Sequence, residues 1–259
     1  MSNPKDTYTI TFGDQAENNV GMQKIGKISK IGFSFNELEE FYQFFKNDFK
    51  MEFINLNEKG LYESKYEEIV EETDKACLLV LRNFITNADD LYNEQKKLIY
   101  DSKALMRGQV KNKLARHNIC FDHKSQKADY EKGKGTIISY DDVPLLKILL
   151  NKLPKIFGLK AKDLVAEGNH YYDITKNGIG FHGDSERKKV IAIRLGATIP
   201  LHYQWFQNSK PIGNRIKLIL NHGDMYVMSE KAVGYDWKKR KIATLRHAAG
   251  CKKYLTIKE

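Results

Sequence analysis

The chain has 259 residues, of which 41% are hydrophobic and 29% are charged. This length and balance fit one large globular domain, or a smaller domain with an added segment, and exclude a disordered or collagen-like chain. No apolar run approaches the ~18 residues that a membrane-spanning helix needs. The first residues, MSNPKDTYTITFGDQ, lack the apolar core of a signal peptide. We therefore expect an intracellular protein of the cytoplasm or nucleus, with no membrane partner.

Basic residues outnumber acidic ones. Lysines and arginines number 43 against 33 aspartates and glutamates, which gives a net charge of +10. Such an excess favours polyanionic partners such as nucleic acid, or small carboxylate ligands, and it is equally consistent with a lysine-rich surface in water. The three cysteines, Cys77, Cys120 and Cys251, are far apart in the sequence. They fit a reducing compartment and predict no disulfide framework.

The first hundred residues predict a mixture of strands and helices. A strand is expected over residues 8–12 (YTITF), and a helix over 36–49 begins at Asn36. The charged residues 58–75 predict a helix or a linker. A buried strand over 76–84 (ACLLVLRNF) precedes a helix over 87–100, which starts at Asn87 and carries acidic residues in its first turn.

From about residue 107 the pattern changes to short strands separated by turns. The apolar spacing predicts a strand over 136–140, a helix over 143–157 and further strands over 169–173, 179–184, 190–195, 216–220, 225–229, 243–249 and 254–258. Helices followed by many short strands predict an α+β protein whose core is a β-sandwich or barrel.

One motif near the middle of the strand-rich part has metal-ligand spacing. In GFHGDS, His182 and Asp184 are two residues apart at the end of a predicted strand, so both side chains are expected on one face. A histidine from a distant strand would complete a two-histidine, one-carboxylate set, which holds Fe(II) and leaves coordination positions open. His222 lies in a turn between two strands, where a histidine tends to stabilise the turn. His247 is followed by small residues that leave room for a metal, and we favour it over His222.

The order of these motifs resembles a known enzyme family. The segment NHYYDITKNGIGFHGDSERK is similar to the metal-binding segment of AlkB-like 2-oxoglutarate- and Fe(II)-dependent dioxygenases, in which an N-x-Y motif precedes the HxD motif. The resemblance continues through NHGDMYVMS and RKIATLRHAAG. It covers residues 76–259, and it leaves residues 1–75 as an N-terminal extension of unknown role. It implies a double-stranded β-helix (jelly-roll) core flanked by helices.

The resemblance also implies roles for individual residues. His182 and Asp184 would bind Fe(II), and Asn169 and Tyr171 would hydrogen-bond the co-substrate 2-oxoglutarate. The family uses two arginines six residues apart on its final strand, and Arg240 and Arg246 have that spacing. An even separation sends both side chains to one face of a strand, and their planar guanidinium groups suit a dicarboxylate.

The sequence departs from the family at the third metal ligand. In several members this histidine follows a tryptophan by two residues, and here Lys239 has that position after Trp237. His247 is the natural substitute, although strand alternation points it away from the face that holds Arg246 unless the strand is bulged. Asp236, His222 or no third ligand at all remain alternatives.

Two further segments are candidates for substrate contacts. Arg107, Lys113 and Arg116 lie within MRGQVKNKLAR, which predicts either phosphate contacts at the mouth of the site or a solvated loop. Tyr203 and Trp205, in HYQWF, would supply a stacking surface for a flipped base or would pack in the core. GMQKIGKI, residues 21–28, departs from a phosphate-binding P-loop because Ile28 replaces the required serine or threonine.

Together these features lead to a functional hypothesis. The resemblance implies a dioxygenase that uses O2 and 2-oxoglutarate to hydroxylate its substrate and releases succinate and CO2. We expect a monomer that hydroxylates or oxidatively dealkylates bases in DNA or RNA, as in DNA repair. One alternative is a hydroxylase of a protein side chain or a small molecule, because this fold accepts many substrates. A second alternative is a non-catalytic nucleic-acid-binding protein that retains the fold.

Overall fold

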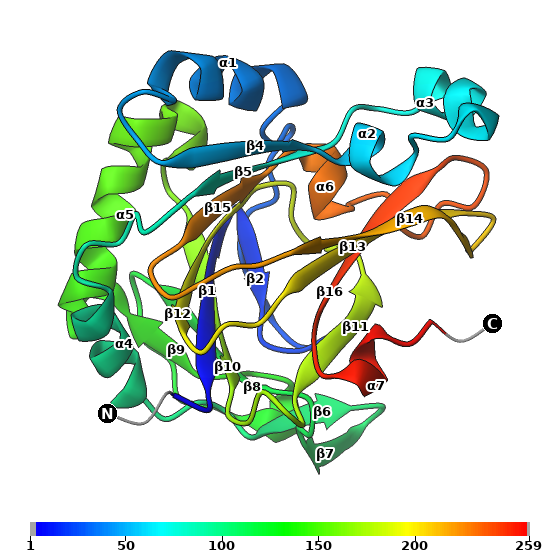
Figure 1. The fold of residues 1–259 in the computed structure, drawn as a ribbon. Coiled ribbons are helices and arrows are strands. Elements are labelled where there is room, and N and C mark those ends of the chain that lie inside the picture. The colour runs from blue at the N-terminus through cyan, green and yellow to red at the C-terminus, as the bar shows by residue number, and fades with distance from the viewer. Residues whose placement is uncertain (1–3, 258–259) are drawn as a thin grey trace.

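The first strand of the chain lies near the centre of the largest sheet. In the computed structural model, which describes residues 4–257, this sheet has eight strands and faces a second sheet of four strands (Figure 1). In spatial order the large sheet contains β4 (Met51–Asn55), β5 (Cys77–Leu81), β15 (Met225–Met228), β12 (Val190–Gly196), β1 (Thr7–Gly13), β10 (Val165–Tyr171), β8 (His117–Asp122) and β9 (Ile137–Ser139). Neighbouring strands are antiparallel except for β8 and β9. The expected α+β class is confirmed.

The small sheet and two hairpins contain the other strands of the described residues. In spatial order the small sheet contains β11 (Gly178–His182), β16 (Thr244–Gly250), β13 (Leu201–Gln207) and β14 (Lys210–Leu218). The hairpins are β2 (Gln15–Glu17) with β3 (Lys24–Gly26), and β6 (Lys103–Met106) with β7 (Gln109–Asn112).

The strand expected over 254–258 is not formed in the part of it that the structure describes. Residues 252–255 instead form the short helix α7 (Lys252–Leu255), whose Tyr254 ring packs directly over Gly178 of β11. Residue 258 lies outside the described residues.

Helices cover the face of the large sheet that is turned away from the small sheet (Figure 1). They are α1 (Phe35–Phe45), α4 (Ala88–Lys96) and α5 (Pro144–Phe157). The other helices, α2 (Leu56–Gly60), α3 (Glu67–Glu72), α6 (Glu230–Val233) and α7, pack against the small sheet or the apolar cluster between the sheets. α1 begins after Ser34 and not at Asn36, because Ser34 and Glu37 form a reciprocal capping box: each side chain accepts a hydrogen bond from the other residue's backbone N–H. The helices expected over 87–100 and 143–157 are confirmed as α4 and α5.

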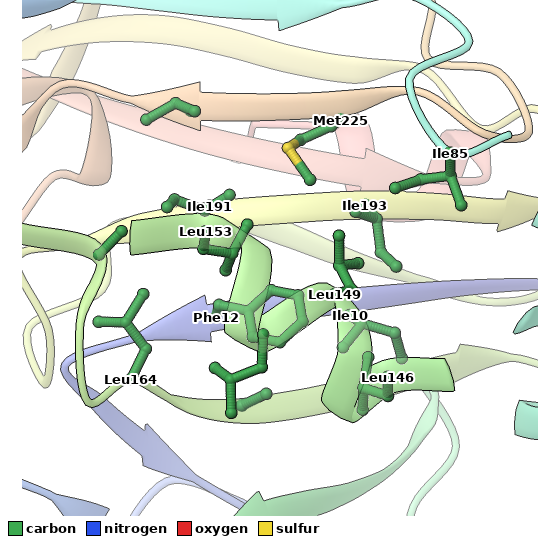
Figure 2. Close-up of a cluster of buried hydrophobic side chains, with 14 of the residues drawn as sticks. Ile10, Phe12, Ile85, Leu146, Leu149, Leu153, Leu164, Ile191, Ile193 and Met225 are labelled. Carbon is green, nitrogen blue, oxygen red and sulfur yellow. The ribbon is translucent and has the colours of Figure 1, made fainter. Parts of the chain in front are cut away.

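Two apolar clusters hold these layers together. Figure 2 shows Ile10 and Phe12 of β1 among Leu146, Leu149 and Leu153 of α5, in the cluster between the large sheet and its helices. The second cluster fills much of the space between the two sheets, with Leu78 and Val80 of β5 and with Tyr203, Trp205 and Leu245 of the small sheet. Because side chains alternate along a strand, β4, β5, β15 and β12 contribute to both clusters.

The domain boundary expected at residue 75 does not match the structure. β1 pairs with β10 on one side and with β12 on the other, and α1 packs against β4 and β5. The N-terminal segment is therefore part of the main fold and not an extension of it. The sequence around β1 does not reveal which strands it pairs with, because both partners follow it by more than 150 residues. No helix among residues 4–257 has both the length and the apolar character needed to cross a lipid bilayer.

The position of β1 leads to a stability prediction. Residues 76–259 produced alone should show no cooperative thermal unfolding by circular dichroism, because β10 and β12 would lose the strand between them. In the full chain, Ile10→Ala should lower the free energy of unfolding by about 2–5 kcal/mol, because it shortens a fully buried side chain. Val20→Ala is the control, since Val20 is 87% exposed. A cooperative transition in the isolated segment would contradict this account.

Candidate metal centre

Three side chains of the metal-ligand types converge at one end of the space between the sheets. His182, Asp184 and His247 offer ligand atoms that all lie within 4.8 Å of one another. Nε2 of His182 lies 3.4 Å from Oδ1 of Asp184, and Nε2 of His247 lies 3.6 Å from the same oxygen. The two imidazole ring centroids are 4.5 Å apart. Two histidines and one carboxylate on one side of a cation fit Fe(II), because the opposite side stays open to other ligands.

A bulge in β11 brings the two histidines to the same face. Ile179 pairs with Ala249, and His182 pairs with His247, so two residues of β11 lie opposite Ala248 of β16. With strict alternation, His182 and Ile179 would point to opposite faces of β11. The additional residue places both on the same face, together with His247. The irregularity therefore lies in β11 and not in the strand of His247, while β16 keeps its regular alternation, and His247 and Arg246 point to opposite faces.

The surroundings of His247 and Asp184 favour the deprotonated forms that metal binding requires. Burial lowers the pKa of His247 to about 3, and the neighbouring His182 adds to this shift. Burial raises the pKa of Asp184, but Arg187 and the two histidines outweigh it and hold that pKa below its usual range. The Nδ1 atom of His182 lies 2.8 Å from the carbonyl oxygen of Gly180, which leaves Nε2 free to bind a cation.

A buried arginine holds the carboxylate ligand from behind. Arg187 donates hydrogen bonds to Glu167 at 2.6 Å and to Glu186 at 2.9 Å, and its Nε lies 3.4 Å from Oδ2 of Asp184. Oδ1 of Asp184 faces the histidines instead. Arg187 therefore fixes the orientation of the carboxylate and has its own charge compensated by the two glutamates.

The three groups open into a cavity of about 660 Å³ between the two sheets. The large sheet lines it with the polar side of its central strands, where Arg194, Thr9 and Asn169 lie side by side across β12, β1 and β10. Arg194 and Thr9 alternate with apolar neighbours that point to the helix layer, such as Ile193 and Ile10. The polar wall and the apolar core are thus opposite faces of the same strands.

Arg194 is buried in the cavity wall without a counter-ion. Arg194 is only 1% exposed, and its Nη1 donates a hydrogen bond of 2.8 Å to Oγ1 of Thr9. Nε has no hydrogen-bond partner, and no carboxylate of the described residues forms an ion pair with this guanidinium. A buried charge without a partner is costly, so this arrangement suits a ligand that brings its own negative charge.

Two tyrosines lie within the electrostatic reach of both Arg194 and Asp184. Burial raises the pKa of Tyr171, and the charge of Arg194 opposes this rise while that of Asp184 adds to it. Burial likewise raises the pKa of Tyr226 to about 12, with the same two opposing influences. Both side chains line the cavity. Their hydroxyls therefore stay protonated and available as hydrogen-bond donors.

Of the four residues expected to bind the co-substrate, two line the cavity and two do not. Asn169 and Tyr171 line the cavity, as expected, and Oδ1 of Asn169 accepts a hydrogen bond of 2.5 Å from Arg116. Arg240 is exposed in the loop before β16, where the even spacing of a strand does not apply. Arg246 lies on the face of β16 opposite His247, against the rings of Phe206 and Trp237. The arginine pair is therefore not at the cavity.

Sequence reasoning missed Arg194, although the sequence carries a signal for it. The strand VIAIRLG is apolar apart from this residue, and an arginine inside such a strand must point to a polar space or carry a counter-ion. The spacing to the histidines gives no hint of this role, because Arg194 belongs to the opposite sheet.

The alternatives for the third ligand are all engaged elsewhere or distant from the cavity. Nδ1 of His222 accepts a hydrogen bond of 2.8 Å from the backbone N–H of Gly196, so this histidine supports its turn, as expected. Asp236 pairs with Lys231 at 2.7 Å, and Lys239 is exposed beside a different hollow. The geometry selects His247.

Most of the expected substrate contacts are not at the cavity. Tyr203 and Trp205 belong to the core between the sheets, and Trp205 donates to the carbonyl oxygen of Leu56 at 2.9 Å. Lys113 is buried and donates to Asn18 and Asn118. Arg107 is exposed at the turn of the β6–β7 hairpin, and of this group only Arg116 lines the cavity. Aromatic alternation in β13 reflects core packing.

The metal centre can be tested by removing its ligands one at a time. Alanine in place of His182, Asp184 or His247 should weaken Co²⁺ binding, measured by titration calorimetry, by more than the roughly 10- to 100-fold that loss of an outer partner of a ligand causes. His222→Ala is the matched control and should leave the affinity unchanged. Equal binding by wild type and all three ligand variants would rule out this site.

Comparison with known proteins adds a relative. No family model matches the chain. It is 49% identical over 260 residues to a protein of Acanthamoeba polyphaga mimivirus named "Uncharacterized protein R156", and the match covers 98% of this chain and 100% of that protein. Identity at this level over the full length shows common descent. The chain therefore belongs to the same protein family as this mimivirus protein.

Proposed function

We propose that the protein is a 2-oxoglutarate- and Fe(II)-dependent dioxygenase. The observation that carries this proposal is a shared cavity, into which both the His182–Asp184–His247 group and the uncompensated Arg194 open. A 2-oxo acid with a second carboxylate matches this pair of features. Its oxo-acid end suits the metal, and its far carboxylate suits the guanidinium.

The arrangement of the sheets supports a double-stranded β-helix core for this enzyme. An eight-stranded and a four-stranded sheet pack face to face, and the ligands come from β11 and β16, which are neighbours in the smaller sheet. The cavity lies between the sheets, where the polar side of β1, β10 and β12 faces the metal-ligand group of the small sheet.

The protein's own residues would bind and orient the reactants. When bound, Fe(II) would supply the redox chemistry that couples O2 and 2-oxoglutarate to the hydroxylation of a substrate carbon, with succinate and CO2 as products. Arg194, held by Thr9, would bind the far carboxylate, and the hydroxyls of Tyr171 and Tyr226 can donate hydrogen bonds beside it. Arg187 keeps the Asp184 carboxylate in place.

The remaining wall of the cavity favours a polar, planar substrate such as a nucleic-acid base. Asn19, Glu17 and Arg116 line this part and offer both hydrogen-bond donors and acceptors, whereas the amide of Asn18 is engaged by Asp101, Asn118 and Lys113. The net charge of +10 adds a general attraction for a polyanion. We therefore propose hydroxylation or oxidative dealkylation of bases as the reaction.

Turnover tests the reaction and its substrate class. With Fe(II), O2 and 2-oxoglutarate present, succinate release measured by NMR should rise when a methylated oligonucleotide is added, and it should not rise with peptides. Stimulation by peptides alone would point to a protein hydroxylase. No consumption of 2-oxoglutarate under any of these conditions would refute the enzymatic proposal and favour a non-catalytic binding protein.

Arg194 and Arg246 form a matched pair for testing the co-substrate site. Arg194→Met should raise the KM for 2-oxoglutarate roughly 10- to 150-fold, the effect of losing a hydrogen bond to a charged group worth about 1.5–3 kcal/mol. Arg246→Met should leave that KM unchanged in the absence of oligonucleotide. A raised KM in Arg246→Met with an unchanged KM in Arg194→Met would assign co-substrate binding to Arg246 instead.

A further inference from the structure

The outer face of the small sheet carries basic and aromatic side chains in contact with one another, which we name the cation–aromatic row. In spatial order its members are Arg215, Phe181, Phe206, Arg246, Trp237 and Lys238. The guanidinium carbon of Arg215 lies 5.0 Å from the ring centroid of Phe181. That ring in turn lies 6.2 Å from the ring of Phe206. The row thus crosses the sheet from β14 to β11 and β13.

The second half of the row continues to the loop before β16. The guanidinium carbon of Arg246 lies 4.0 Å from the ring centroid of Phe206 and 5.2 Å from that of Trp237. Nζ of Lys238 lies 5.6 Å from the ring of Trp237. Arg246 is therefore in contact range of two rings, which fix the plane of its guanidinium group.

The same strand geometry that forms the metal centre creates this row. His247 points into the cavity, so Arg246, the residue before it, points outward. The bulge of β11 turns His182 inward, and Phe181 lies against Phe206 and Arg215 on the outer face. The row and the candidate metal centre are opposite faces of β11 and β16.

The cations of the row have no acidic partners. Within residues 4–257, no carboxylate forms an ion pair with Arg215, Arg246 or Lys238. Nε of Arg246 also lacks a hydrogen-bond partner, as does the indole nitrogen of Trp237. By contrast, three lysines around the hollow beside α1 are paired with carboxylates: Lys160 with Glu37, Lys188 with Glu230 and Lys231 with Asp236. The Nε of Arg246 and the indole nitrogen of Trp237 are buried, so the charges that the row offers to a bound chain are those of the exposed Arg215 and Lys238 and the outer part of the Arg246 guanidinium.

The row reaches the rim of the cavity that holds the candidate metal centre. Phe181, Trp237 and Lys238 also line that cavity. Trp237 packs directly over Gly183, the residue between His182 and Asp184, and a Cβ atom at Gly183 would lie 2.7 Å from Cβ of Trp237. A chain bound along the row would therefore arrive beside the metal ligands. Three more exposed basic residues, Lys239, Arg240 and Lys241, follow Lys238 in the same loop.

We propose that the cation–aromatic row binds a single-stranded nucleic acid and leads it to the mouth of the cavity. Single strands are bound where basic groups hold the phosphates and aromatic side chains provide surfaces for bases. The row supplies exposed basic groups at Arg215 and Lys238 and partly exposed rings at Phe181 and Trp237, while the ring of Phe206 is buried against Arg246. An acidic peptide would match the charges but would leave the ring surfaces of Phe181 and Trp237 unused. The inference rests on the proposed function in one respect, because that function makes nucleic acid the substrate.

Binding of a labelled oligonucleotide tests the row without turnover. A fluorescein-labelled oligothymidylate of about 16 nucleotides, near the upper end of known single-strand site sizes, is titrated with protein lacking Fe(II) and 2-oxoglutarate, and anisotropy is recorded. The double variant Arg215→Met, Arg246→Met should bind roughly 10- to 30-fold more weakly at ~0.1 M salt. The slope of log K against log salt should fall in magnitude by about 1.4, because two phosphate contacts are lost.

Two controls separate this site from general charge. The double variant Lys152→Met, Lys155→Met removes the same charge from α5, on the far side of the large sheet, and should leave affinity and slope nearly unchanged. Arg215→Met alone changes only an exposed side chain, so it tests the row even if the replacement of Arg246 disturbs folding. It should reduce the slope by about half of the double variant's change.

Several outcomes would overturn the inference. They are unchanged binding in both Arg215 variants, an equal loss in the α5 control, and tighter binding of polyglutamate than of the oligonucleotide with the same dependence on Arg215. The last result would assign the row to an acidic protein partner. Oligonucleotide binding that depends on the row, without 2-oxoglutarate consumption, would uphold the row and refute the enzymatic proposal. Turnover of 2-oxoglutarate without row-dependent binding would uphold the enzymatic proposal and refute the row.

Discussion

A single additional residue in β11 determines what the small sheet can do. Without the bulge, His182 would share the outer face of the sheet, and His247 would have no partner across the strand pair. With it, two imidazoles lie opposite each other on the inner face, and the Asp184 carboxylate follows two residues later. Bulges commonly redirect a side chain beside a functional site, and the additional backbone residue here gives one sheet two chemically different faces.

The cavity contains two buried arginines whose environments differ in one respect. Arg187 is surrounded by Glu167, Glu186 and Asp184, so its charge is compensated and its position is fixed. Arg194 has only the Thr9 hydroxyl and lacks a negative partner among the described residues. Because both guanidinium groups are buried, this difference points to different roles for them. Arg187, whose charge is compensated, orients the Asp184 carboxylate. Arg194, whose charge is not compensated, is suited to the carboxylate of a bound molecule.

The central strands of the large sheet make both the core and the site possible. On β1, Ile10 and Phe12 join the helix layer, while Thr9 lies in the cavity wall beside Arg194. The strand thus gains stability on one face and gives the other face to polar groups. The cost of burying those groups is reduced by cross-strand contacts such as that between Arg194 and Thr9.

The sequence by itself determined the local features. Periodicity identified β1, β5, α4 and α5, and the GFHGDS motif identified His182 and Asp184, because strand and helix periods and short ligand spacings are written in neighbouring residues. Only the tertiary structure decided that β1 belongs inside the main sheet, that His247 and not His222 lies beside His182 and Asp184, and that Arg194 and not Arg246 lies at the cavity. These outcomes depend on the bulge of β11 and on pairing between strands far apart in the chain, and a one-residue change in register reverses which face a side chain occupies.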